Sequence, residues 1–268
     1  MKIRHATQTD EGTAVENTFV AYDDLENCLG EADVSEYMRD MLCPSRPHHL
    51  KVRVDCEEEA MDALLGAATA RAMLLARGAA AAARIYAQCG AEDTLFMRAL
   101  TAQGYKDDDA LIRMRRPLRR GPIVKPMPAG CVIVRDYLID ETESRFFLER
   151  HNAVFAENRD MAYLRELKQK PNFARLLAVA PGGLAGELIT WSDGAAGVVG
   201  VVETPPAWQK KGVASYLMEQ ARMYWLSKGL STAYFDVWTR LTGAMRLAAT
   251  SGFRPAEVIC RYPGIDYQ

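Results

Sequence analysis

Residues 204–229, TPPAWQKKGVASYLMEQARMYWLSKG, predict a helix that begins near Gly212 and has no side chain to cap it. Apolar residues recur after this point with the period of an α-helix: Val213, Leu217, Ala221 and Tyr224. The first N–H groups of a helix have no partner inside it and carry partial positive charge. Ser, Thr, Asp or Asn usually caps them, and residues 209–214 contain none of these.

The approach to this helix, QKKGVA at 209–214, suits a bound anion. Lys210 and Lys211 supply positive charge, and the small residues Gly212 and Ala214 let a ligand come close to the backbone. Such a helix start holds a phosphate or diphosphate. The alternative is a surface helix capped by solvent, with both lysines exposed. The stretch lacks the glycine patterns of nucleotide P-loops and dinucleotide folds, which argues against nucleoside triphosphates and NAD.

The composition is that of a globular protein with room for two domains: 268 residues, 49% of them hydrophobic and 25% charged. The net charge is −2, and the sequence has no polybasic tail. It therefore lacks the positive charge that proteins use to bind nucleic acids or membrane surfaces. The N-terminus lacks the features of a signal peptide, and the apolar region at 60–83 is interrupted by charges. The six cysteines form no CxxC pair, so we expect reduced thiols and a cytoplasmic protein.

A proline-rich stretch divides the chain into two halves. Its prolines disfavour a helix, so we predict an extended linker at 117–129 between domains at 1–116 and 130–268. The halves repeat weakly. Placing Gly252 on Gly104 aligns a short strand, a polar turn and a helix that ends at glycine followed by an aromatic residue. In the second half, strands and helices alternate in an order that predicts an α/β fold with a mixed sheet.

Two segments of the second half resemble the GNAT N-acetyltransferase superfamily. Gln209-x-x-Gly212-x-Ala214 follows a strand and opens a long helix, and it is similar to that family's acyl-coenzyme A loop, Arg/Gln-x-x-Gly-x-Gly/Ala. LTGAMRLAATSGF at 241–253 is similar to its second motif. The resemblance covers 130–268. The first half resembles a degenerate GNAT domain, which implies a tandem arrangement, also found in mycothiol synthase.

This resemblance implies acetyl-CoA as the cosubstrate and places its binding site at the loop. The strand from Val202 to Thr204 would pair with the pantetheine arm. Backbone amides of the loop would hold the diphosphate: Gln209, Lys210, Lys211, Gly212, Val213 and Ala214. The acyl carbonyl would sit where the strands before and after the long helix splay apart, open to direct attack by an amine.

Glu203 falls where some family members carry a general base that acts through water. The alternative is an ordinary acid at a strand end that faces solvent. The family's frequent tyrosine acid falls on Ala248, and its frequent asparagine falls on Leu241. Because alanine cannot protonate a thiolate, either water or another residue does so, or the domain binds acyl-CoA without efficient turnover.

We expect only the second half to bind coenzyme A. In the first half, Asp55 and Glu58 predict a capping box at the corresponding helix, and Glu57 and Glu59 add negative charge there. The residues before Asp55 also look too few for a full set of central strands.

The sequence thus predicts an N-acyltransferase that moves an acetyl group from acetyl-CoA to an amine. The rival is a non-catalytic acyl-CoA-binding or interaction protein. The acceptor stays open among a small amine, an aminoglycoside-like cation, a peptide N-terminus and a lysine. His151 either faces the acceptor or lies on a helix surface, and we expect the latter. No metal is expected, since His48-His49 has no third ligand at metal spacing and predicts a solvated pair.

Overall fold

The computed structural model describes residues 1–7, 14–122 and 125–268, which form two compact units. The first unit consists of Met1–Leu111, Val154–Ala156 and Val258–Gln268, and the second of Ile112–Ala153 and Glu157–Glu257. By this division the expected linker at 117–129 falls within the range of the second unit, and the last residues of the chain pack with the first.

The first unit is a six-stranded sheet covered by helix α1 (Met61–Gly78). The strands are, in sheet order, β1 (Lys2–His5), β2 (Thr18–Tyr22), β3 (Cys28–Met38), β4 (His48–Cys56), β5 (Ala83–Ala87) and β14 (Gly264–Tyr267). Neighbours are antiparallel except β4 and β5, which are parallel. Shorter elements are the 3₁₀ turns η1 (Val15–Asn17) and η2 (Glu58–Ala60), strand β6 (Cys89–Gly90) and helix α2 (Thr94–Ala102). Small and branched residues of α1 form the buried core with the sheet: Leu64, Leu65, Ala68 and Ala72.

Two expectations for this unit are wrong. Asp55 does not cap a helix, because it lies in β4 opposite Glu31 of β3. Helix α1 begins at Met61, after η2, and no side chain caps either element. The residues before Asp55 also suffice for the central strands, since β1 to β4 all lie within 2–56. Long antiparallel hairpins need few linking residues, so four strands fit in this length.

The second unit is a mixed α/β sheet. Its strands are, in sheet order, β8 (Val132–Asp136), β9 (Ala174–Ala180), β10 (Gly183–Asp193), β11 (Ala196–Glu203), β12 (Thr232–Trp238), β7 (Ala110–Pro117) and β13 (Arg254–Arg261). The helical elements are α3 (Glu141–Phe155), α4 (Met161–Gln169), the 3₁₀ turn η3 (Pro206–Trp208), α5 (Val213–Ser227) and α6 (Thr242–Thr250). Neighbours from β8 to β11 are antiparallel, and β11 and β12 are parallel.

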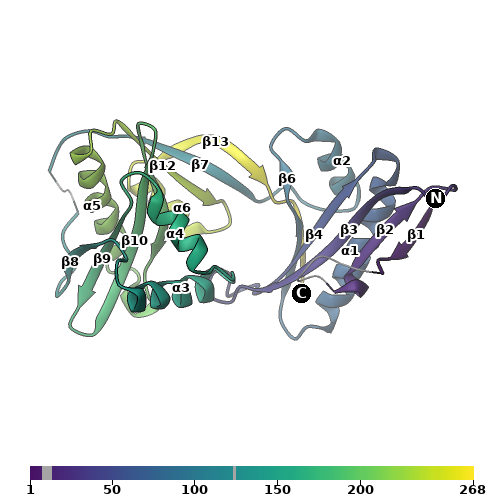
Figure 1. Cartoon of the computed structure of the whole chain (residues 1–268), viewed down its shortest axis with the longest axis horizontal. Helices are drawn as coiled ribbons and strands as arrows, with labels where there is room; N and C mark the ends of the chain where they lie inside the picture. The colour runs from purple at the N-terminus through teal and green to yellow at the C-terminus, as the bar shows by residue number, and fades with distance from the viewer. Residues whose placement is uncertain (8–13, 123–124) are drawn as a thin grey trace. The chain divides into compact units, whose positions relative to one another are not determined.

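In each unit, the strand beside the parallel pair comes from a distant part of the sequence. The C-terminal strand β14 pairs with β5 in the first unit, so the yellow end of the chain in Figure 1 lies in the unit that contains the N-terminus. Strand β7, which follows α2 in the sequence, lies beside β12 in the second unit. The two halves therefore exchange one strand each.

The predicted repeat is confirmed by the helices that precede Gly104 and Gly252. Helices α2 and α6 cover matching positions at the offset that places one glycine on the other. Both glycines are left-handed, with φ of 88° and 86°. The aromatic residue that follows each glycine is buried and donates its N–H to the carbonyl five residues back. Among the helices of the described ranges, none has the length and apolarity needed to cross a lipid bilayer.

Candidate functional site

Helix α5 begins at Val213, as predicted, and no side chain caps it. Gly212 has φ 85° and ψ 0°. This left-handed backbone conformation strains residues other than glycine. Lys210, two residues earlier, is also left-handed with φ 59°. A β-carbon built on Gly212 would have no atom within 4 Å, so the space in front of this helix end is open. Left-handed residues just before a helix turn successive N–H groups toward one concave face, which favours an anion.

The loop is fastened to the end of β11. Gln209 donates from Nε2 to the backbone oxygen of Thr204 at 3.1 Å. The ammonium group of Lys211 lies 4.9 Å from the centre of the Trp208 ring. The hydroxyl oxygen of Thr204 is buried and has no hydrogen-bond partner in the described part of the chain. The strand end therefore keeps one polar atom unsatisfied next to an open helix start.

Strands β11 and β12 separate before they end. Their parallel register runs from Ala196 opposite Thr232 to Val199 opposite Phe235. Beyond this point β11 continues to Glu203 and β12 to Trp238, and the register across the described residues goes no further. The edge of β11 from 200 to 203 is thus available to an extended ligand.

A β-bulge coincides with the separation. The β10–β11 register shifts between Ile189 and Thr190, so that Gly200 has no partner residue. A β-carbon on Gly200 would lie 1.9 Å from the Trp191 ring, so only glycine fits there. A bulge bends its strand and increases its twist, which accounts for the divergence of β11 from β12.

Glu203 lies at the end of β11, directly opposite Glu187 of β10. Burial raises the pKa of the Glu203 carboxyl above its ordinary value, and the negative charge of Glu187 raises it further. Arg150 and Arg175 act in the opposite direction. The result is a half-buried carboxylate that holds a proton more readily than a solvated glutamate does.

Glu187 itself is fully buried and is held by two arginines. Its carboxylate accepts from Nε of Arg175 at 2.7 Å and from Nη2 of Arg150 at 3.0 Å. The second of these arginines comes from α3, which fixes that helix over this face of β10. Arg175 also contacts Asp136 at 3.2 Å and Glu143 at 3.4 Å. Sequence reasoning missed this network, although a charge inside ARLLAVA and another inside LAGELITW were its signal.

His151 is buried, so the expectation of a helix-surface histidine is wrong. Its ring lies 5.8 Å from the ring of Tyr163 on α4, nearly parallel to it, and its Nε2 lies 3.3 Å from Glu157. Burial lowers the pKa of His151, and the charge of Glu157 acts against that shift. His48 and His49 are not solvated either. Both are buried at the start of β4.

Ala248 on α6 is fully buried, so this position supplies neither an acid nor an open space. Within the residues that the structure covers, no three His, Cys, Asp or Glu side chains gather as a metal site would require.

Comparison with solved structures shows which fold this chain has. No family model matches the chain. No curated protein matches it either. A GCN5-related N-acetyltransferase of Sphaerobacter thermophilus is 18% identical with a TM-score of 0.54, over 96% of this chain and 82% of that one. A probable N-acyltransferase of Enterococcus faecalis V583 is 12% identical with a TM-score of 0.55, over 93% of this chain and 62% of that one.

A third similar structure is the glucosamine N-acetyltransferase region of a fungal multi-domain β-N-acetylglucosaminidase. It is 14% identical with a TM-score of 0.51, and the alignment covers 92% of this chain but only 33% of the fungal one. Because these alignments run through both units, the chain has the GNAT fold in a tandem arrangement, as predicted.

Proposed function

We propose that the second unit transfers an acetyl group from acetyl-CoA to an amine. The observation that carries this proposal is the open, uncapped start of α5 beside the point where β11 and β12 separate. A diphosphate fits the first feature and an extended pantetheine arm fits the second, and the two features adjoin in one loop.

In this proposal the cosubstrate is held mainly by backbone groups. Backbone groups at Val202 and Thr204 pair with the amides of pantetheine, and the unsatisfied Thr204 hydroxyl gains a partner. The N–H groups of residues 212–214 receive the diphosphate, together with those of Lys210 and Lys211. The N–H of Gln209, which the sequence also assigned to the diphosphate, already donates to the backbone oxygen of Pro206 at 3.3 Å. Gln209 keeps the loop in place through its bond to Thr204. The Lys211 head group lies on Trp208, so we assign it a smaller share of the binding.

The reaction is a direct transfer. The amine nitrogen attacks the thioester carbonyl carbon, so a C–N bond forms and the C–S bond breaks. Glu203, with its raised pKa, takes the proton of the amine through a water molecule. Ala248 provides no acid, so the leaving thiolate takes its proton from water or from another residue. The acceptor must present its nitrogen as a neutral amine, and its class stays open among a small amine, an aminoglycoside-like compound, a peptide N-terminus and a lysine.

A second candidate function is acyl-CoA binding without turnover. The observation in its favour is Ala248, which is fully buried at the position where the resemblance to the GNAT motif implies a tyrosine acid. Both candidates bind the cosubstrate, and only the enzyme consumes it.

The test is release of free coenzyme A thiol when the chain is incubated with acetyl-CoA and pooled amines. We expect release that depends on an acceptor and an acceptor that gains the mass of an acetyl group. Tight acetyl-CoA binding without release against any pool would favour the binding protein instead.

We further propose that the first unit does not bind coenzyme A. The start of α1 follows η2, and no left-handed glycine precedes it. Glu57, Glu58 and Glu59 surround this helix end with negative charge, which repels a diphosphate. The negative charge of these three glutamates, and not the expected cap by Asp55, is our reason for this proposal.

A further inference from the structure

The second unit contains a cavity of about 410 Å³ away from the α5 loop. It is bounded by the end of β7 with the segment that follows it, by the middle of α5, and by Gly252 after α6. Its polar lining is mostly arginine: Arg116, Arg119, Arg120 and Arg222, together with Glu219. We call it the arginine cavity. Four guanidinium groups against one carboxylate leave a local excess of positive charge.

One wall of the arginine cavity is built by Arg222, which is almost fully buried. Its Nε donates to Glu219 at 2.9 Å, and Nη1 donates to the backbone oxygen of Arg119 at 2.9 Å. Its Nη2 donates to the backbone oxygens of Gly121 and Pro122 at 3.3 and 3.0 Å. Arg222 is therefore committed to holding the segment after β7 against α5, and it gives the wall a fixed shape.

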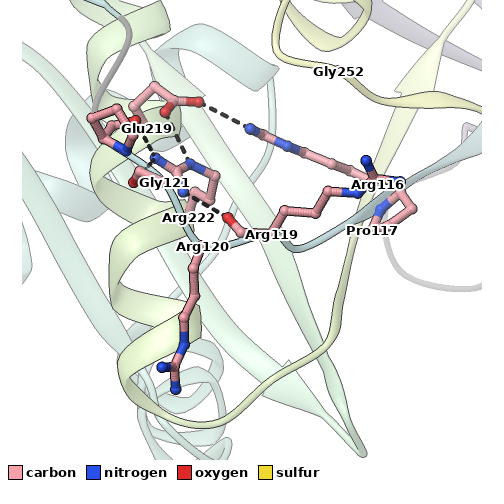
Figure 2. Close-up of a pocket in the computed structure, with 9 residues that line it drawn as sticks. Arg116, Pro117, Arg119, Arg120, Gly121, Glu219, Arg222 and Gly252 are labelled. Atoms are coloured by element: carbon pink, nitrogen blue, oxygen red, sulfur yellow. Dashed lines mark hydrogen bonds and ion pairs between the residues drawn. The ribbon is translucent and has the colours of Figure 1, made fainter.

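The Arg116 guanidinium uses only part of its hydrogen-bonding capacity. Its Nη2 donates to the second oxygen of Glu219 at 3.1 Å, while its Nη1 is buried and has no hydrogen-bond partner in the described ranges. Figure 2 shows Arg116 and Arg222 meeting at this one carboxylate. A buried charged N–H without an acceptor is costly, and such a group in a native structure calls for an explanation. An anion in the cavity would supply the acceptor once the Arg116 side chain turned to expose Nη1.

Arg119 and Arg120 bring further positive charge to the rim. Both are exposed, and neither forms an ion pair with an acid of the described chain. In Figure 2 the Arg120 side chain extends away from Glu219, so its charge lies apart from the carboxylate that Arg116 and Arg222 share. Guanidinium groups bind phosphate oxygens in a two-pronged way that ammonium groups do not match.

The arginine cavity is not a part of the α5 loop. It touches α5 at Glu219 and Arg222, in the second and third turns of a helix that begins at Val213. At its other side, Leu118 donates to the backbone oxygen of Ser231, just before β12 begins. The β11–β12 separation lies toward the opposite end of β12.

We propose that the arginine cavity binds a small anion that carries a phosphate group, separately from the acyl-CoA site. Its volume lies in the range of small-molecule sites, which favours a compact phosphorylated compound over a macromolecule. The anion would accept from the exposed guanidinium of Arg119, with Arg120 strengthening the field, and a turn of the Arg116 side chain would bring its Nη1 to the anion.

The test is calorimetric titration with inorganic pyrophosphate in a Gly212→Asp background, which closes the α5 loop to diphosphate. We expect a site whose affinity falls at least tenfold when Arg119→Ala and Arg120→Ala are added. Arg116→Lys should also weaken pyrophosphate binding, because lysine keeps the positive charge near Glu219 but lacks the paired N–H donors of the guanidinium.

The matched control is Arg115→Ala. Arg115 is exposed on the same strand, one residue from Arg116, so it points to the opposite face of the sheet. It should leave pyrophosphate affinity within about twofold. Equal binding by the double variant, or an equal loss with Arg115→Ala, would overturn the proposal. Absence of any pyrophosphate binding by the Gly212→Asp chain would overturn it as well, without bearing on the acetyl-CoA site.

Discussion

Gly212→Asp is expected to weaken acetyl-CoA binding at least tenfold, a loss of about 1.4 kcal/mol. A carboxylate at this position would lie in the open space in front of the helix, where it would block the approach of the diphosphate and repel its negative charge. Because the left-handed φ of 85° strains any residue with a side chain, circular dichroism must first show that the variant is folded. Calorimetric titration with acetyl-CoA measures the effect.

The matched control for this variant is Gly194→Asp. Gly194 is also left-handed, with φ 53°, and also has open space around it, but it lies in the turn between β10 and β11. That turn is at the end of β11 opposite to Glu203. Acetyl-CoA affinity should be unchanged there. Lys210→Ala should cost less than Gly212→Asp, because an exposed charge acts through screening solvent. A folded Gly212→Asp chain that binds acetyl-CoA as the parent does would rule out the loop.

Glu203→Gln should lower turnover about 100-fold or more at neutral pH and leave acetyl-CoA affinity nearly unchanged. Glutamine keeps the size of the side chain and its place opposite Glu187, but it cannot accept a proton from the amine. Steady-state thiol release gives the turnover, and calorimetry gives the affinity. Glu149→Gln is the control, since Glu149 is an exposed acid on α3. Full activity in Glu203→Gln would remove this residue from the mechanism.

The pH dependence follows from the raised pKa of Glu203. A general base works only when deprotonated, so the rate should fall as the pH falls through this pKa. Because burial and Glu187 move the pKa upward, the loss begins at a higher pH than for a solvated glutamate. Glu203→Gln should remove this limb of the profile. An unchanged acid limb would mean that another group sets it.

The features that sequence predicted correctly depend on local chemistry. The start of α5 follows from Gly212 and from the apolar period after it, and both are visible within a few residues. The match of α2 with α6 follows from a glycine that must be left-handed and an aromatic residue that must be buried. Such constraints act between neighbours in the chain, so a short segment carries them.

The features that sequence missed depend on pairing between distant segments. Asp55 looks like a helix cap, but it lies in β4, which forms a long hairpin with β3 and places Asp55 opposite Glu31. The exchange of β7 and β14 cannot be seen in either strand, because both have ordinary strand patterns. Glu187 and His151 look like surface residues until Arg175 and Tyr163 are brought against them.

Amide hydrogen exchange with and without acetyl-CoA tests the central claim most directly. We place the diphosphate on the backbone N–H groups at the start of α5, which no side chain caps. This placement predicts that acetyl-CoA slows exchange at residues 212–215, leaves residues 57–63 at the start of α1 unchanged, and has no such effect in Gly212→Asp. Bound acetyl-CoA with unchanged exchange at 212–215, or with protection at 57–63 instead, would contradict it.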